Sequence, residues 1–130
     1  MIVLANGCWD VLHYGHLLHL EEAKKHGELL YVSVTEDAFV NKGKGRPVFP
    51  QDERLALVRA LAIVHGAFLV SSALEALKAI EPDVYVKGSE YEGKLPEEAY
   101  CKDRGIKVVY TRCKTYSSTK LLRFYESRRL

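Results

Sequence analysis

Apolar, strand-like runs alternate with helix-like segments along the whole 130-residue chain, and this alternation constrains the fold most strongly. It is typical of βαβ units, in which consecutive strands are parallel and the connecting helices cover the sheet. We therefore expect an α/β fold with a parallel sheet of about five strands and helices on both faces. The strands are expected at Ile2–Ala5, Leu29–Thr35, Ala67–Val70, Asp83–Lys87 and Ile106–Thr111.

The helices are expected between these strands, and capping residues mark several of their ends. The expected helical segments are Tyr14–His26, a turn at Glu36–Val40, Gln51–Val64, Ala73–Ile80, a helix from Pro96 to Gly105, and Ser117–Ser127. Gly27 and Gly105 are placed to end helices, and Ser72 with Glu75 has the spacing of a capping box. Neither a repeat nor a linker divides the chain, so a single domain is expected over residues 1–130.

The charge balance and the cysteines exclude several classes of protein. Nineteen basic and 17 acidic side chains leave a net charge of +2, too small for a protein that depends on attraction to nucleic acid. Glu126 interrupts the basic tail at 123–129, which a solvated helix end explains about as well. Three cysteines without paired spacing favour a reducing, cytoplasmic compartment. The first residues carry no basic leader, and no run reaches the ~18 apolar residues of a membrane span, so we expect neither a signal peptide nor a membrane partner.

The loop after the first strand, NGCWDVLHYGH, concentrates polar side chains where α/β proteins bind ligands. His13 and His16 are three residues apart, so both lie on one face of the expected helix start. Gly15 leaves room for a close ligand, and the N–H groups of the first helical turn favour an anion. The spacing predicts a phosphate site, although ordinary polar residues near a helix cap fit it as well. A metal site that includes His19 is disfavoured, because zinc-binding helices pair histidines at i and i+4 with a carboxylate.

Two further loops carry charges or hydroxyls suited to phosphate. Lys42, Lys44 and Arg46 lie in a glycine-rich loop that could clamp phosphates, or could simply be solvated. The hydroxyls of residues 117–119 open the last expected helix, where they could cap it or also donate to phosphate. The segment 88–95 nearly spells a phosphate-binding P-loop, but it has leucine at the magnesium-binding hydroxyl position, so we reject that reading.

Four segments in order resemble the cytidylyltransferase-like nucleotidyltransferases. GCWDVLHYGH is similar to their GxFDxxHxGH signature, with Trp9 at the phenylalanine position. Residues 112–119 resemble the RTxGISTT segment of that family and depart from it at Cys113 and Thr115. DVYVKGSEY at 83–91 resembles the DxxVKGxDY segment of heptose 1-phosphate adenylyltransferases, and NKGKGRPVF resembles the glycerol-3-phosphate cytidylyltransferase branch. The resemblance covers residues 1 to about 122 and implies a Rossmann-like fold.

The resemblance also implies the reaction. A nucleoside monophosphate would pass from a nucleoside triphosphate to a sugar phosphate, with ATP and D-glycero-D-manno-heptose 1-phosphate or a similar acceptor as the leading substrates. The alternative pair is CTP with glycerol 3-phosphate or phosphoethanolamine. A non-catalytic nucleotide-binding module is the alternative from another class. Mg²⁺ is expected with the triphosphate and without protein side-chain ligands, and a homodimer is expected.

Site residues follow from the matching positions. The implied catalytic residues are His13, His16, Lys42 and Arg112. The implied nucleotide-binding residues are Gly7, Cys8, Trp9, Gly15, Lys44, Arg54, Lys87, Ser117, Ser118 and Thr119. Asp10 and Lys87 are the candidates for contacts with the acceptor, and Lys42 is preferred to Lys44 as the lysine nearest the triphosphate.

Overall fold

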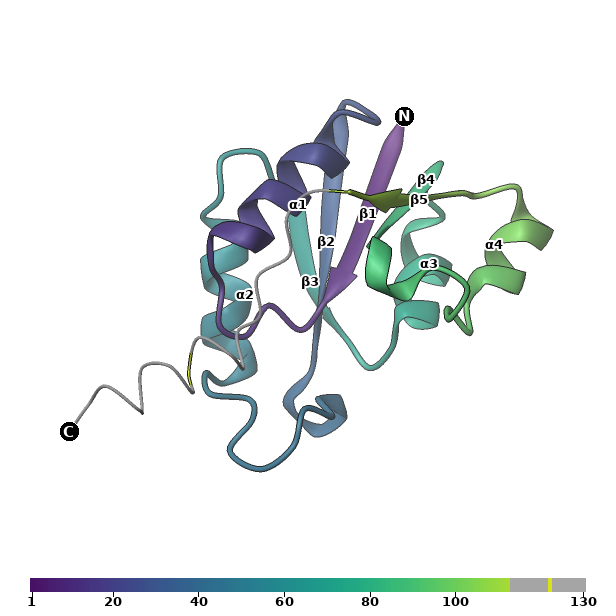
Figure 1. Ribbon diagram of the computed structural model, residues 1–130. Coiled ribbons are helices and arrows are strands. Elements are labelled where there is room, and N and C mark those ends of the chain that lie inside the picture. The colour runs from purple at the N-terminus through teal and green to yellow at the C-terminus, as the bar shows by residue number, and fades with distance from the viewer. Residues whose placement is uncertain (113–121, 123–130) are drawn as a thin grey trace.

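A single parallel sheet forms the centre of the molecule in the computed structural model, which describes residues 1–112 and residue 122 (Figure 1). Its strands are β1 (Ile2–Gly7), β2 (Leu29–Thr35), β3 (Gly66–Val70), β4 (Val84–Gly88) and β5 (Lys107–Thr111). They lie in the order β3-β2-β1-β4-β5, and every neighbouring pair is parallel. The expected five-stranded Rossmann-like sheet is therefore confirmed.

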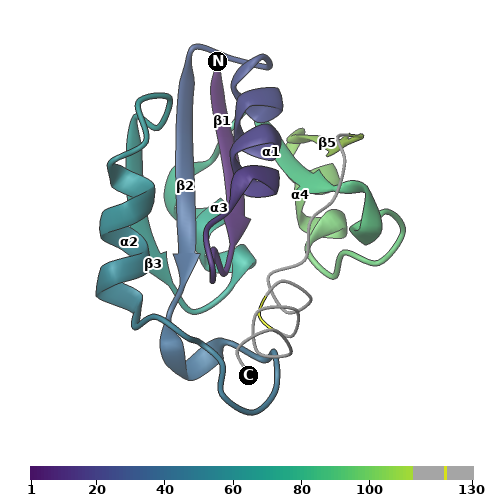
Figure 2. The same ribbon diagram turned by 60° about the vertical axis from the view of Figure 1, so that its left-hand side comes forward.

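Helices cover both faces of this sheet, as Figures 1 and 2 show. The helical segments are α1 (Tyr14–Lys24), α2 (Gln51–Arg59), α3 (Ala73–Ile80) and α4 (Glu98–Arg104), with single 3₁₀ turns η1 (Asp37–Phe39) and η2 (Ser89–Tyr91). Helices α1 and α2 lie on one face, and α3 and α4 on the other. No helix among the described residues is long and apolar enough to cross a membrane.

Two apolar layers result from the alternation of side chains along the central strand. Val3 and Ala5 of β1 belong to the layer under α1 and α2, together with Leu20 and Val58. Leu4, between them, points to the opposite layer, under α3 and α4. Since successive side chains of a strand point to opposite faces, the part of a strand that is buried on both sides is apolar, as Val3–Ala5 of β1 is.

Several element ends differ from their expected positions. Strand β1 extends through Gly7, because its last two residues still pair with β2. Helix α2 ends at Arg59, five residues early, and the chain then turns back so that β3 can pair with β2. Helix α1 ends at Lys24. Gly27 does not have a positive φ, so it is not a left-handed cap. A Cβ there would lie 2.5 Å from the carbonyl oxygen of Met1, and this close approach explains the glycine.

The strand order reverses between β1 and β4, and this reversal determines where a ligand crevice opens. In open α/β sheets ligands bind beyond the carboxyl ends of the strands at such a point. The chain leaves β1 through the His13–His16 segment and leaves β4 through residues 88–95. The last expected helix, Ser117–Ser127, and the basic tail lie outside the described residues.

Candidate active site

His13 directly precedes α1 and His16 lies in its first turn, and their rings cap that turn. The Nδ1 of His13 accepts a hydrogen bond from the N–H of Gly15 at 3.1 Å, and the Nδ1 of His16 accepts from the N–H of His13 at 3.2 Å. The rings stack with their centroids 3.9 Å apart. Because each Nδ1 accepts, each neutral ring carries its proton on Nε2, where it is a donor. The capping alternative is thus correct, and capping orients two ring N–H donors as a pair.

The same capping corrects one expectation about the backbone. The N–H of Gly15 is engaged by the His13 ring, and the N–H of His16 donates to the His13 carbonyl at 3.0 Å. These N–H groups are therefore used within the turn and do not form the expected anion site. The donors that His13 and His16 offer are their ring N–H groups.

Burial keeps both rings neutral. The pKa of His16 is lowered to about 3, chiefly by burial and then by the nearby His13 and Lys42. Burial and then Lys42 also lower the pKa of His13. At neutral pH both rings are therefore uncharged hydrogen-bond donors, the form that stabilises developing negative charge without a prior protonation step.

Trp9 supports His16 from the apolar core, which differs from its implied role as a nucleotide contact. Its side chain is 4% exposed, and its Nε1 donates to the carbonyl of Ser33 at 2.9 Å. The indole meets the His16 ring edge-on, with centroids 5.3 Å apart. A Cβ on Gly7 would lie 2.9 Å from this indole, so packing accounts for that glycine.

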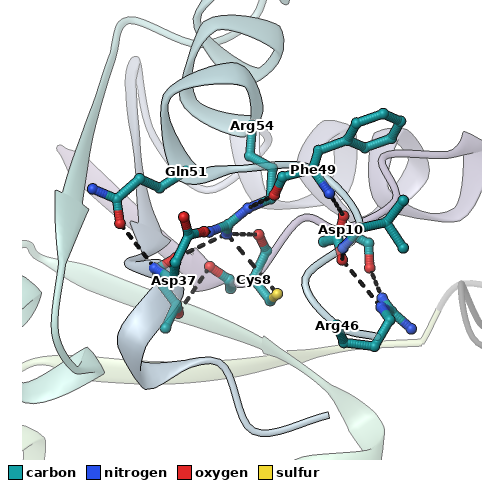
Figure 3. A network of polar contacts seen from close by, with 10 residues as sticks. Cys8, Asp10, Asp37, Arg46, Phe49, Gln51 and Arg54 are labelled. Atoms are coloured by element: carbon teal, nitrogen blue, oxygen red, sulfur yellow. Dashed lines mark hydrogen bonds and ion pairs between the residues drawn. The ribbon is translucent and has the colours of Figure 1, made fainter. Parts of the chain in front are cut away.

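Asp10 is fully buried and joins the site loop to the basic loop, as Figure 3 shows. Its carboxylate accepts from the N–H groups of Val48 and Phe49, at 2.7 and 3.0 Å, and from Nε of Arg46 at 3.0 Å. Burial by itself would raise the pKa of Asp10, but these donors outweigh burial and the pKa lies below its usual value. Protein donors thus surround this carboxylate in the structure, whereas the resemblance implies a contact with the acceptor.

Arg54, which the resemblance implies as a nucleotide contact, is also buried. The guanidinium donates to the carbonyls of Cys8, Thr35 and Phe49 at 2.7 to 2.9 Å, and to Asp37 at 2.6 Å (Figure 3). Its side chain has no exposed area. Arg54 thus joins the loop after β1 to the end of β2 and the start of α2.

The two loop lysines differ in their relation to the histidines. Both Lys42 and Lys44 are exposed, in a loop whose Arg46 is neutralised by Asp10. The charge of Lys42 lowers the pKa values of His13 and His16. It acts in the same direction on the pKa of Cys8, a half-buried thiol whose pKa is raised overall by burial. Lys42, and not Lys44, is thus among the charges that lower the pKa values of the two rings.

Lys87 closes the site from the end of β4. Its side chain is 8% exposed, its Nζ donates to the carbonyl of Asn6 at 3.1 Å, and the ammonium lies 4.3 Å from the centre of the Tyr91 ring. Burial lowers the pKa of Lys87, and the carboxylates of Glu97 and Glu90 partly oppose this. The structure therefore holds this cation at the carboxyl ends of β1 and β4, between Asn6 and Tyr91.

His19 continues the histidine series but is held by β5. Its Nδ1 lies 2.8 Å from Oγ1 of Thr111, which is 3% exposed. Burial, followed by the charge of Lys87, lowers the pKa of His19 to about 4. No group of three histidine, cysteine, aspartate or glutamate side chains within the described part of the chain gathers to hold a metal ion.

Arg112 follows directly after this contact and forms a surface ion pair. Its guanidinium lies 2.9 Å from the carboxylate of Glu92, with both side chains more than half exposed. An exposed pair of this kind contributes little to stability and can exchange readily for another anion. Ser117, Ser118 and Thr119 lie outside the described residues.

Sequence reasoning missed the side chains that support the site. The carboxylate of Asp37 anchors Arg54, and the hydroxyl of Thr111 contacts His19. The backbone carbonyl of Ser33 anchors Trp9. The only local signal for the role of Asp37 is its position, two residues beyond the end of β2. A separate hollow of about 300 Å³ lies at the amino ends of β4 and β5, away from the histidines. Its lining residues include Glu81, Tyr100 and Arg104.

Comparison with known families gives a match over nearly the whole chain. A model described as cytidylyltransferase-like matches residues 4–124. Among curated proteins, the bifunctional protein HldE of Nitratiruptor is 42% identical over 97 residues, which are 72% of this chain and 21% of the relative. The HldE protein of Streptomyces coelicolor is 42% identical over 113 residues, 83% of this chain and 24% of the relative. The chain therefore spans about a fifth to a quarter of the length of these relatives.

Solved structures extend the comparison to the fold. A lipopolysaccharide core biosynthesis protein from Thermoplasma volcanium superposes with a TM-score of 0.72 and 31% identity, covering 90% of this chain and 98% of that one. Pantothenate synthetase from Thermus thermophilus superposes with a TM-score of 0.69 and 17% identity, covering 98% of this chain and 63% of that one. The second similarity concerns the fold alone.

Proposed function

The chain belongs to the cytidylyltransferase-like family of nucleotidyltransferases, and from this premise we propose that it transfers a nucleoside monophosphate from a nucleoside triphosphate to a sugar phosphate. The leading substrates are ATP and D-glycero-D-manno-heptose 1-phosphate or a similar sugar phosphate. The DVYVKGSEY segment and the similarity to HldE and to a lipopolysaccharide biosynthesis protein support this choice. Mg²⁺ would enter as part of the nucleotide substrate, bound by phosphate oxygens and water.

The reaction requires an in-line exchange at the α-phosphorus. A phosphate oxygen of the acceptor forms a bond to that phosphorus, the bond from it to the oxygen bridging toward the β-phosphate breaks, and pyrophosphate leaves. Positioning and charge neutralisation matter more here than a protein nucleophile. The Nε2–H groups of His13 and His16 would donate to the phosphoryl oxygens as negative charge develops on them. Lys42 would neutralise charge on the triphosphate.

The observation that carries this proposal is the stacked histidine pair. Two partly buried rings, with centroids 3.9 Å apart and each held at Nδ1, carry two neutral Nε2–H donors side by side. Removing a single donor of this kind typically lowers the rate about 10²- to 10³-fold. A non-catalytic binding module would not need that precise arrangement and would tolerate loss of either ring.

A second candidate differs in both substrates. The loop NKGKGRPVF also resembles the branch that uses CTP with glycerol 3-phosphate, and Lys42 in this loop lies near the histidine pair. CTP with phosphoethanolamine belongs to the same alternative.

A pyrophosphate-release assay distinguishes these candidates by crossing ATP and CTP with heptose 1-phosphate, glycerol 3-phosphate and phosphoethanolamine. Turnover with ATP and heptose 1-phosphate, lowered at least a hundredfold in His16→Ala, is the expected result. Turnover with CTP alone would replace the adenylyl reading with the cytidylyl one. No turnover with any pair, or full activity in His16→Ala, would favour a binding module. Lys78→Ala, on the outer surface of α3, is the matched control.

The remaining site residues, the oligomer and the compartment belong to the same proposal. Arg112 would exchange Glu92 for a nucleotide phosphate, with Ser117, Ser118 and Thr119 beside it, and Lys44 would lie at the outer edge of the triphosphate. Lys87 would meet the acceptor phosphate. A homodimer in a cytoplasmic, reducing compartment is proposed, the latter because the three cysteines lack paired spacing.

A further inference from the structure

The basic loop that carries Lys42 is held at its far end by a buried carboxylate. Asp10 has no exposed area and accepts from two consecutive backbone N–H groups, those of Val48 and Phe49. Arg46 completes the contact through Nε at 3.0 Å and through a second nitrogen that donates to the main-chain carbonyl of Asp10. The segment 46–49 is therefore bound to the same loop that carries His13, as Figure 3 shows.

The near end of the basic loop is held by a second set of contacts at the start of α2. The N–H of Asp37 donates to the side-chain oxygen of Gln51 at 2.8 Å, and the Asp37 carboxylate accepts from Arg54 at 2.6 Å. Arg54 also donates to the carbonyl of Phe49 at 2.9 Å, so one guanidinium joins both ends of the loop. The two ends of the loop, at Asp37 and at Phe49, are thus both bound to the start of α2.

Between these ties, the arc 41–45 is exposed and has few internal constraints. Gly43 and Gly45 have φ of 96° and 80°, and a Cβ added to either would meet no atom within 4 Å. The space around these two glycines is thus open among the described residues, and the ties at the two ends of the arc set its direction. Lys42 lies within this arc, yet its charge lowers the pKa of His13 and His16.

We propose that Asp10 is a positioning residue, whose buried carboxylate holds the segment 46–49 and thereby places the Lys42 ammonium beside the histidine pair. This inference rests on the proposed function, since it describes how the triphosphate cation is placed. Asp10 would act through the loop, because its carboxylate is fully buried and bound by protein donors. A merely structural role would leave the effect of Lys42 on its neighbours unchanged as long as the protein stays folded.

A ligand-free test uses the pKa of His13, measured by NMR in four proteins: wild type, Lys42→Gln, Asp10→Asn and the double variant. In the wild-type background, Lys42→Gln should raise the pKa of His13, because a nearby positive charge is removed. In the Asp10→Asn background, the same change should raise it much less. An equal rise in both backgrounds would overturn the proposal. Should Asp10→Asn fail to fold, Arg46→Gln, which leaves both backbone contacts of the carboxylate, takes its place.

A second test measures binding of Mg·ATP and Mg·CTP by calorimetry in the same four proteins. Loss of a charge-assisted contact weakens binding roughly tenfold, so Lys42→Gln should do so in the wild-type background and by less than about twofold in Asp10→Asn. Independent, additive effects contradict the positioning role. Asp83→Asn is the control for general destabilisation, because the Asp83 carboxylate accepts from the backbone N–H of Ile2 at the amino end of β1. This variant should leave the effect of Lys42→Gln on nucleotide binding intact.

The two tests separate this inference from the proposed function. A wild-type protein that binds neither nucleotide would contradict the proposed function, while the His13 measurement would still decide whether Asp10 places Lys42. A wild-type protein that binds nucleotide, with equal effects of Lys42→Gln in both backgrounds, would retain the function and remove the role of Asp10.

Discussion

The ring of His16 meets the indole of Trp9 edge-on, with centroids 5.3 Å apart, and the indole is itself fixed by a hydrogen bond to Ser33. The ring of His16 thus contacts both the indole of the apolar core and the stacked ring of His13. Aromatic pairs in this arrangement contribute about 0.5–1.5 kcal/mol beyond the burial of their area. The orientation of His16 therefore depends on a residue that is itself 4% exposed.

This relationship predicts a graded response to substitution of Trp9. Trp9→Phe keeps a ring against His16 and loses the bond to Ser33, so stability should fall by about 1 kcal/mol and kcat by less than about threefold. Trp9→Leu removes the ring contact, and kcat should fall about tenfold or more at unchanged KM for the nucleotide. Steady-state kinetics and urea unfolding measure both quantities. Equal kcat in the two variants would show that the ring contact does not orient His16.

His19 predicts a dependence of stability on pH. Its pKa is lowered from 6.5 to about 4 in the folded protein, chiefly by burial, so between these values the unfolded chain binds a proton that the folded chain does not. The stabilisation is therefore complete above pH 6.5 and is lost as the pH falls toward 4. His16 acts in the same direction, whereas Asp10, with a pKa below 3.8, acts at lower pH.

His19→Asn should weaken this dependence, because asparagine does not titrate and its amide can still bond to Thr111. Urea midpoints of the variant and the wild type, measured from pH 7.5 to pH 4.5, provide the test. The wild-type midpoint should fall more steeply with decreasing pH. Parallel curves would mean that His19 does not titrate in this range.

We expect substitution of Lys87 to lower the activity while leaving the free energy of unfolding almost unchanged. Lys87→Met replaces a buried ammonium by an apolar chain of similar length, and the lost bond to Asn6 is offset by the removed cost of burying charge, so stability should change by less than about 1 kcal/mol. If the ammonium meets the acceptor phosphate, kcat/KM for the sugar phosphate should fall roughly tenfold to a hundredfold. Lys78→Met, exposed on α3, is the control. Unchanged kcat/KM would remove Lys87 from the acceptor site.

We expect substitution of Arg54 to cause a large loss of stability, because the carbonyls that accept its hydrogen bonds are left without donors. Arg54→Met should lower the free energy of unfolding by about 3–5 kcal/mol. Arg59→Met, on the same helix, is a suitable comparison, since Arg59 is exposed and donates only to the carbonyl of Ala67 among the described contacts. It should cost less than about 1 kcal/mol. Similar losses in urea unfolding of the two variants would contradict this reading of the network in Figure 3.

Much of the fold could be predicted because its signals are local. Ser72 caps α3 by accepting from the N–H of Glu75 at 3.2 Å, and Gly105 ends α4 with φ of 71°, both as expected. The ends that were wrong depend on distant partners. Asn6 and Gly7 read as a turn but continue β1, because β2 supplies their hydrogen-bond partners.

The candidate site likewise has features that the local sequence shows and features that depend on distant partners. The His13–His16 spacing is visible within four residues, and the structure brings these rings together as a stacked pair. Asp10 and Arg54, which the resemblance implies as substrate contacts, bind protein groups of the surrounding loops in the structure. Nothing in their immediate sequence distinguishes a ligand-facing charge from a buried one, because that depends on which donors or acceptors the fold brings to them.

The sequence by itself determined the order of elements, the parallel sheet, the family and the histidine pair, since periodicity and short spacings carry that information. Only the tertiary structure decided which charges face the crevice. Asp10 meets Arg46 across 36 residues, and His19 meets Thr111 across 92. A buried ion pair is stable only when every partner is in place. For that reason the folded arrangement, and not the residue type, separates Asp10 and Arg54 from the exposed Lys42.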